Sequence, residues 1–174
     1  VVARRLREVP ERRFLTLEEW GTLEAVVSRL LPQPDRPGQA VPVAPWIDAM
    51  LDRNQGDGYR FADMPPLREA WRLGLAGIEE ESVRRYERRF ADLAPREQDE
   101  ELGCIQRGVV RSDLWSRLPP ERFFTGHLLK TVVGTYYSHP AAWSEIGFGG
   151  PASPRGYVRL GFDQRDPWEA EARP

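Results

Sequence analysis

Residues 66–90, PLREAWRLGLAGIEEESVRRYERRF, decide the fold class, because their apolar side chains keep one spacing over the whole stretch. These residues recur about every 3.6 positions, the period of one face of an α-helix. They predict a helix over 65–90, about 40 Å long and the spine of the domain. Gly74 and Gly77 weaken this helix by up to about 1 kcal/mol each, unless another helix approaches closely there. The residues that keep the period are Leu67, Ala70, Trp71, Leu75, Ile78, Tyr86 and Phe90.

Upstream, Thr16-Leu17-Glu18-Glu19 has the pattern of a capping box, in which the Thr16 hydroxyl accepts from the amide of Glu19 and the Glu19 carboxylate accepts from the amide of Thr16. We therefore expect a first helix from Thr16 to Leu31, which the proline-rich stretch 32–42 ends. Its apolar face comprises Trp20, Leu23, Val26, Val27, Leu30 and Leu31.

A short second helix is predicted from about Pro45 to the turn NQGDG at 54–58. We expect Trp46, Ile47, Met50 and Leu51 on its inner face, and Asp48, Asp52 and Arg53 on its outer face.

Two further helices open with proline in the first turn. The fourth begins at Pro95, with Leu102, Ile105 and Val109 facing inward. The fifth begins after 119–120 and ends at His139-Pro140, because a residue before proline is disfavoured in the helical region. No useful period-two alternation is present. The sequence therefore predicts an all-α fold, an irregular bundle of about five helices.

The chain is divided into a helical bundle over 1–140, with a basic N-terminal arm at 1–13, and a non-helical tail over 141–174 that belongs to the same domain. This tail is rich in glycine, proline and aromatic residues, and disordered segments are poor in aromatics. Two interpretations remain open. The aromatic rings lie over the chain's own bundle as a strap, or they anchor a partner protein.

Composition excludes several function classes. A net charge of −2 over 174 residues gives no field that would concentrate nucleic acid or hold an anionic membrane. No stretch approaches the roughly 20 apolar residues of a membrane span, so we expect no direct membrane insertion. The single cysteine, Cys104, excludes an internal disulfide.

No residues converge as a catalytic site. His127 and His139 lie twelve positions apart, about 18 Å along a helix, too far to share a metal. We expect His127 to be a packed or partly exposed side chain, and His139 to interact with a helix C-terminus. The acidic triplets 79–81 and 99–101 fan around their helices, and we interpret both as solvated faces.

Two blocks resemble the gluconate 2-dehydrogenase subunit 3 family. In the first, 16–51, a helix ends in Leu-Pro, a turn with Asp and Pro-Gly follows, and a second helix carries an Ile-Asp pair. In the second, 123–157, an aromatic-rich helix continues into Tyr-Tyr-x-x-Pro, a Trp, Ile-Gly-Phe and a Gly-Pro-rich turn. Together they cover about 70 residues, and the second is the more specific.

The resemblance implies a non-catalytic small subunit that binds, stabilises and helps to fold or export a large flavoprotein of the glucose-methanol-choline class, a sugar or glycoside dehydrogenase. FAD and the catalytic base then belong to that partner and no cofactor to this chain. A cytochrome c or another electron acceptor is a further candidate partner. The alternative is a self-contained helical scaffold or adaptor with no flavoprotein partner.

Family members often carry a twin-arginine leader. Arg4-Arg5 and Arg12-Arg13 lack the apolar segment that such a signal requires downstream. As written, the chain is expected in the cytoplasm, and removal of an earlier leader would place it in the periplasm.

The stretch 135–157 is the predicted contact with the flavoprotein. We expect Tyr136 and Tyr137 to end the fifth helix with exposed rings, and His139-Pro140 to turn the chain so that Trp143 and Phe148 enter partner pockets. The predicted interface residues are Tyr136, Tyr137, His139, Pro140, Trp143, Ile146, Phe148, Pro151 and Tyr157.

Overall fold

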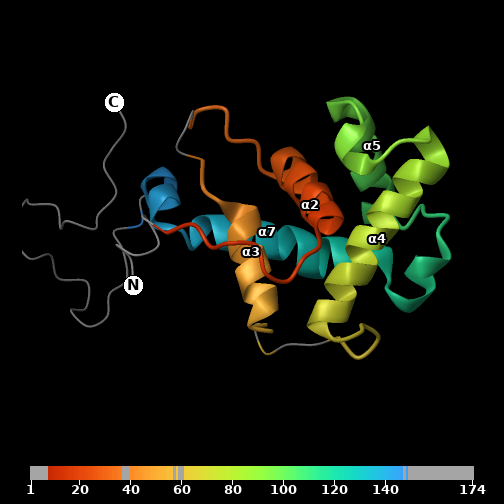
Figure 1. Cartoon of the computed structure of the whole chain (residues 1–174), viewed down its shortest axis with the longest axis horizontal. Helices are drawn as coiled ribbons and strands as arrows, with labels where there is room; N and C mark the ends of the chain where they lie inside the picture. The colour runs from red at the N-terminus through yellow and green to blue at the C-terminus, as the bar shows by residue number, and fades with distance from the viewer. Residues whose placement is uncertain (1–7, 37–39, 57, 59–60, 147, 149–174) are drawn as a thin grey trace, which may run out of the picture.

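The computed structural model describes residues 8–36, 40–56, 58, 61–146 and 148, and these form helices joined by turns, without a β-strand (Figure 1). The all-α prediction is confirmed. The main helices are α2 (Leu17–Leu30), α3 (Val43–Asp52), α4 (Leu67–Tyr86), α5 (Pro95–Gln106) and a continuous helix made of α6 (Pro120–Arg122), η3 (Phe123–Leu129) and α7 (Lys130–Tyr137). Three 3-10 helices, η1 (Phe90–Asp92), η2 (Asp113–Arg117) and η4 (Pro140–Ile146), complete the set.

The predicted capping box begins α2. The Glu19 amide donates to Thr16 Oγ1 over 3.2 Å, and the Thr16 amide donates to Glu19 Oε2 over 2.8 Å. The helix ends at Leu30, immediately before the proline-rich stretch. α3 begins at Val43, two residues earlier than predicted.

Side chains from other elements pack directly on the two glycines of α4. The ring of Phe123 lies over Gly74, and the indole of Trp115 lies over Gly77, so a Cβ at position 77 would be 2.5 Å from Trp115 Cζ2. Another element therefore packs closely on α4 at each of these glycines, and this contact accounts for glycine at two positions where it weakens the helix. Phe123 belongs to η3, a π-helical segment whose wider turn directs both Phe123 and Phe124 into the core.

One predicted helix end and one predicted inward-facing residue were wrong. α4 stops at Tyr86 instead of residue 90, because Glu87 adopts a left-handed conformation with φ 55°. Phe90 is still fully buried, but it reaches the core from η1. α5 stops at Gln106, before Gly108 with φ 70°, and Val109 is consequently 57% exposed instead of facing inward.

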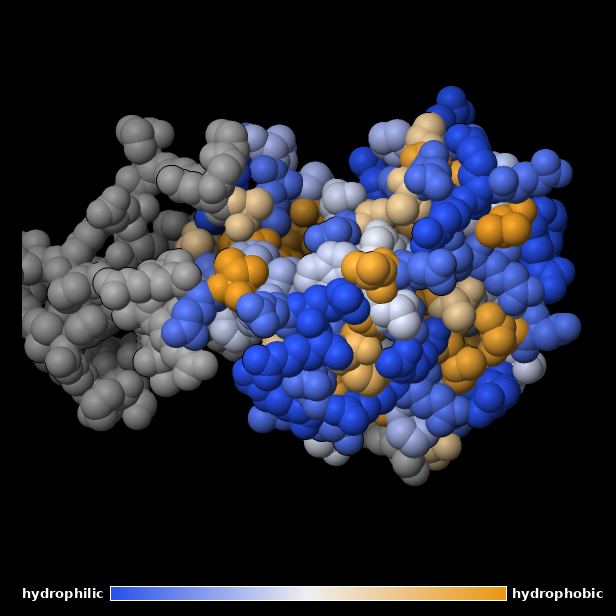
Figure 2. Space-filling model, viewed as in Figure 1, coloured by the Kyte–Doolittle hydropathy of each residue, from blue (hydrophilic) through white to orange (hydrophobic). Residues whose placement is uncertain are grey.

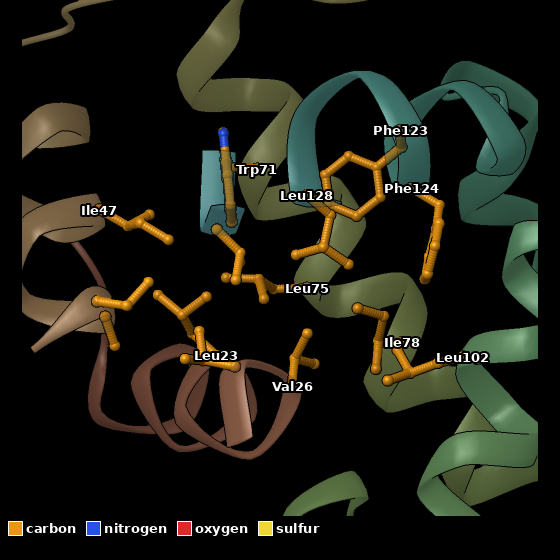
Figure 3. Close-up of a cluster of buried hydrophobic side chains, with 14 of the residues drawn as sticks. Leu23, Val26, Ile47, Trp71, Leu75, Ile78, Leu102, Phe123, Phe124 and Leu128 are labelled. Atoms are coloured by element: carbon orange, nitrogen blue, oxygen red, sulfur yellow. The ribbon is translucent and has the colours of Figure 1, made fainter. Parts of the chain in front are cut away.

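One hydrophobic core joins all the main helices (Figure 3). Trp71 and Leu75 of α4 lie between Leu23 of α2 and the π-helical segment (Figure 3). The ring of Phe123 packs edge to face on Trp71, with ring centroids 6.0 Å apart. The bundle is built from three main helix contacts: α2 packs on α4, α2 packs on α3, and α3 packs on α7.

Asp48 is fully buried, so its predicted place on the outer face of the second helix was wrong. Its carboxylate accepts hydrogen bonds from the backbone amides of Arg13 (2.6 Å), Phe14 (3.1 Å) and Leu15 (2.8 Å). A buried carboxylate is stable in such a site because several amide donors replace water. Asp48 therefore fastens the segment before α2 to α3.

The acidic triplets are not wholly solvated either, because Glu81 of α4 and Glu101 of α5 are buried. Glu81 Oε1 accepts from the amides of Arg111 and Ser112, each over 2.6 Å, which fixes the connection after α5 to α4. Glu101 lies 3.2 Å from Arg85 Nη1, but neither of its oxygens accepts an aligned hydrogen bond from the described residues. Burial is the main cause that raises the pKa of Glu101, with Arg85 opposing it.

Candidate partner-binding interface

The predicted interface residues that the structure describes lie in the last turn of α7, in η4 and in the residues that adjoin η4, His139 and Phe148. The tail was predicted to be non-helical, but its described beginning, Pro140–Ile146, forms the 3-10 helix η4. Pro151 and Tyr157 lie outside the described residues.

Tyr136 belongs to the core. Its ring is 5% exposed, so the expectation of an exposed ring was wrong. The neighbouring Tyr137 packs edge to face against it at 5.0 Å, and the guanidinium of Arg36 lies 5.8 Å from the Tyr136 ring centroid. Tyr137 itself is 39% exposed, as predicted.

His139 and Pro140 form the turn between α7 and η4. The amide of His139 donates to the Tyr136 carbonyl over 2.9 Å, so this residue lies at the C-terminus of α7. The imidazole is buried, and its Nδ1 accepts from the amide of Ala141 over 3.3 Å. The histidine side chain therefore orders the first turn of η4.

Trp143 folds back onto α7. Its indole nitrogen donates to the carbonyl of Tyr137 over 3.1 Å, which satisfies one of the acceptors left open at a helix C-terminus. The side chain is 7% exposed. For this residue the burial favours the strap interpretation, and its part in a partner interface stays a prediction.

Three of the predicted interface residues expose apolar surface on this segment: Tyr137, Ile146 (55%) and Phe148 (40%). We name them the terminal patch. Trp143 links two of them, since it bonds to the Tyr137 carbonyl and its ring lies edge to face with Phe148 at 5.2 Å. On the face drawn in Figure 2 the described surface is mostly hydrophilic, with separated apolar spots.

An open groove of about 770 Å³ lies where α3 packs against α7. Sequence reasoning missed it, because its two walls come from segments about 80 positions apart. α3 contributes an apolar wall through Trp46, Ala49 and Met50, and the other wall is the polar face of η3 and α7, comprising Gly126, His127, Lys130, Thr131, Gly134, Thr135 and Ser138.

His127 is a half-buried residue of this groove, and its ring packs edge to face on Phe123 at 6.4 Å. This agrees with the expectation of a packed or partly exposed histidine. Within the described ranges, no cluster of three or more His, Cys, Asp or Glu side chains is arranged to hold a metal ion. None of the described helices combines the length and the apolar character that crossing a bilayer requires.

Comparison with protein families gives one match that covers most of the chain: the model of gluconate 2-dehydrogenase subunit 3 matches residues 17–150. The match begins at the first residue of α2 and includes every main helix and the terminal patch. Comparison with curated proteins and with solved structures finds no match. The all-α bundle and the extent of the match together show that the chain belongs to the gluconate 2-dehydrogenase subunit 3 family.

Proposed function

We propose that this chain is a non-catalytic small subunit that binds and stabilises the large flavoprotein subunit of a sugar dehydrogenase of the glucose-methanol-choline class. FAD and the catalytic base belong to that partner. The family match supports the role of a dehydrogenase subunit. Assistance in folding or export of the flavoprotein is a further part of the proposal.

The observation that carries the proposal within this chain is the terminal patch. Tyr137, Ile146 and Phe148 expose large apolar side chains within twelve residues, in the block 123–157 that resembles the family. Aromatic and aliphatic anchors that pack on an ordered segment bind with less loss of side-chain entropy than mobile ones. The buried Trp143 provides that order beneath the patch.

The test is purification of the tagged chain from its native source, followed by identification of the captured protein by mass spectrometry and flavin absorbance. We expect a flavoprotein in a fixed ratio to the chain. Replacement of two anchors in Ile146→Ser/Phe148→Ser should weaken the complex at least tenfold, because interface anchors commonly contribute 2 kcal/mol or more.

A matched control is Val109→Ser, which removes an equally exposed apolar side chain at the end of α5. It should leave the affinity unchanged. Capture of no flavoprotein by the wild-type chain would contradict the proposal and favour the scaffold alternative, which the burial of Tyr136 and Trp143 against the chain's own bundle supports.

A further inference from the structure

A polar cluster lies between α4 and α5, at the opposite end of the described bundle from η4 (Figure 1). It comprises Glu101 and Cys104 of α5, Arg85 of α4, and Arg107, which directly follows α5. The proposed function makes no use of this cluster. We propose that Cys104 is a peroxide-sensitive thiol, which hydrogen peroxide oxidises to a sulfenic acid. This reactivity does not depend on a flavoprotein partner.

The first step of the argument is the positive charge at the thiol. Arg85 Nη1 donates to Cys104 Sγ over 3.2 Å, and Arg107 Nη2 donates to it over 3.7 Å. Arg107 folds back along α5 because Gly103 has no side chain, and a Cβ there would lie 3.1 Å from Arg107 Nη1. The bond to Cys104 is the main cause that raises the pKa of Arg85, so this guanidinium stays charged. Guanidinium groups beside a cysteine favour the thiolate, which is its nucleophilic form.

The second step is a buried acid at the same place. Glu101 lies three positions before Cys104, on the same face of α5. Its side chain is 1% exposed, and neither of its oxygens accepts a hydrogen bond from the described residues. Oε2 lies 3.2 Å from Arg85 Nη1, the nitrogen that also donates to Cys104. Buried oxygens without a donor mark a place where water or another small donor binds, and each O–H group of hydrogen peroxide is such a donor.

The third step is access. Cys104 is 8% exposed, so its sulfur lies close to the surface. The two arginines that contact it reach solvent, since Arg107 is exposed and the side chain of Arg85 is 19% exposed. A molecule little larger than water can pass these flexible side chains. A bulky thiol reagent meets the surrounding helices first, so the site suits a peroxide better than a large electrophile.

The oxidation balances with the groups that are present. The Glu101 carboxylate takes the proton of the Cys104 thiol. The thiolate sulfur attacks one oxygen of hydrogen peroxide, an S–O bond forms, the O–O bond breaks and hydroxide leaves. The Glu101 carboxyl group then returns its proton to the hydroxide, which becomes water. Sulfur loses two electrons and the peroxide gains them. Burial raises the pKa of Glu101, which suits a group that must both accept and donate a proton.

A rate comparison tests the proposal, because Cys104 is the only cysteine and every thiol signal comes from it. The purified chain is mixed with hydrogen peroxide at pH 7 and excess dimedone, which traps sulfenic acid, and mass spectrometry follows the adduct over time. The chain unfolded in urea gives the rate of the same thiol without the cluster. We expect the folded chain to react about tenfold faster, because a stabilised thiolate and a proton donor both accelerate the step. A folded chain that reacts no faster overturns the proposal, and Cys104 is then an inert core side chain.

Variants of the cluster test its action on the sulfur. Arg107→Gln removes one guanidinium at an exposed position, and Glu101→Gln keeps the shape of the acid without its proton transfer. Each should slow the folded chain about three- to tenfold and leave the rate in urea unchanged. Arg96→Gln is the matched control, since Arg96 is exposed in the first turn of α5 and makes no contact with the thiol. It should change neither rate. If Arg107→Gln and Glu101→Gln both react like wild type, the cluster does not activate Cys104 and the proposal is wrong.

Discussion

The carboxylate of Asp48 on α3 accepts a hydrogen bond of 2.8 Å from the backbone amide of Leu15, the residue before the α2 capping box. Two further amides, of Arg13 and Phe14, donate to the same carboxylate. The Ile-Asp pair that suggested the family therefore has a structural role: Ile47 fills the core and Asp48 fastens the start of the bundle.

The first prediction replaces this buried carboxylate by its neutral amide. Asp48→Asn puts an NH2 group against backbone donors, so at least one buried amide loses its acceptor. We expect a loss of about 3 kcal/mol, the range for hydrogen bonds to a buried charge. The melting temperature measured by circular dichroism should fall by about 6–12 °C. Asp52→Asn, one turn further along α3 and outside the contact, should change it little, and equal effects of the two substitutions would contradict the role of Asp48.

A second prediction concerns the glycine that allows α4 to approach the π-helical segment. Gly74→Ala places a methyl group where the Phe123 ring lies, and such overpacking costs about 1–3 kcal/mol. On propensity alone the same substitution would stabilise a helix. Gly21→Ala on α2 is the control, because no atom outside its own helix turn lies within 4 Å of the new Cβ, and it should add about 0.5–1 kcal/mol. Opposite signs in urea denaturation are the expected result.

These residues show how far sequence reasoning extends. Periodicity, prolines and the capping box predicted the five helices, because such signals are local. The burial of Asp48, Glu81 and Glu101 was missed, because each depends on a segment distant in sequence. The same limit explains the groove, whose walls meet only when α3 packs on α7.

The third prediction uses the buried Glu101. Burial raises its pKa in the folded chain, so the folded state holds this proton more tightly than the unfolded state does. The ionised Glu101 carboxylate therefore destabilises the folded chain. This loss of stability is absent below the pKa of Glu101 in the unfolded chain, about 4.3, grows as pH rises, and is complete above its pKa in the folded chain. The stability of Glu101→Gln relative to wild type should therefore increase with pH over this interval.

Urea denaturation of both proteins from pH 4 upward measures this difference. Glu100→Gln is the control, since Glu100 is exposed on the same turn of α5. Its difference from wild type should stay nearly constant with pH. A relative stability of Glu101→Gln that falls as pH rises would mean that the pairing with Arg85 outweighs burial.

The last prediction separates the two roles of the aromatic segment through Trp143. Because this side chain is 7% exposed and bonded to the Tyr137 carbonyl, its removal should affect the chain in the absence of any partner. Trp143→Ala removes a buried ring, for which a loss of about 3 kcal/mol is typical, and should lower the melting temperature of the lone subunit by about 6–12 °C. Trp143→Phe keeps a ring but loses the hydrogen bond, so its cost should be smaller, about 1 kcal/mol. If both variants melt like wild type while Trp143→Ala binds the flavoprotein tenfold more weakly, Trp143 is an anchor for the partner and not a strap on α7.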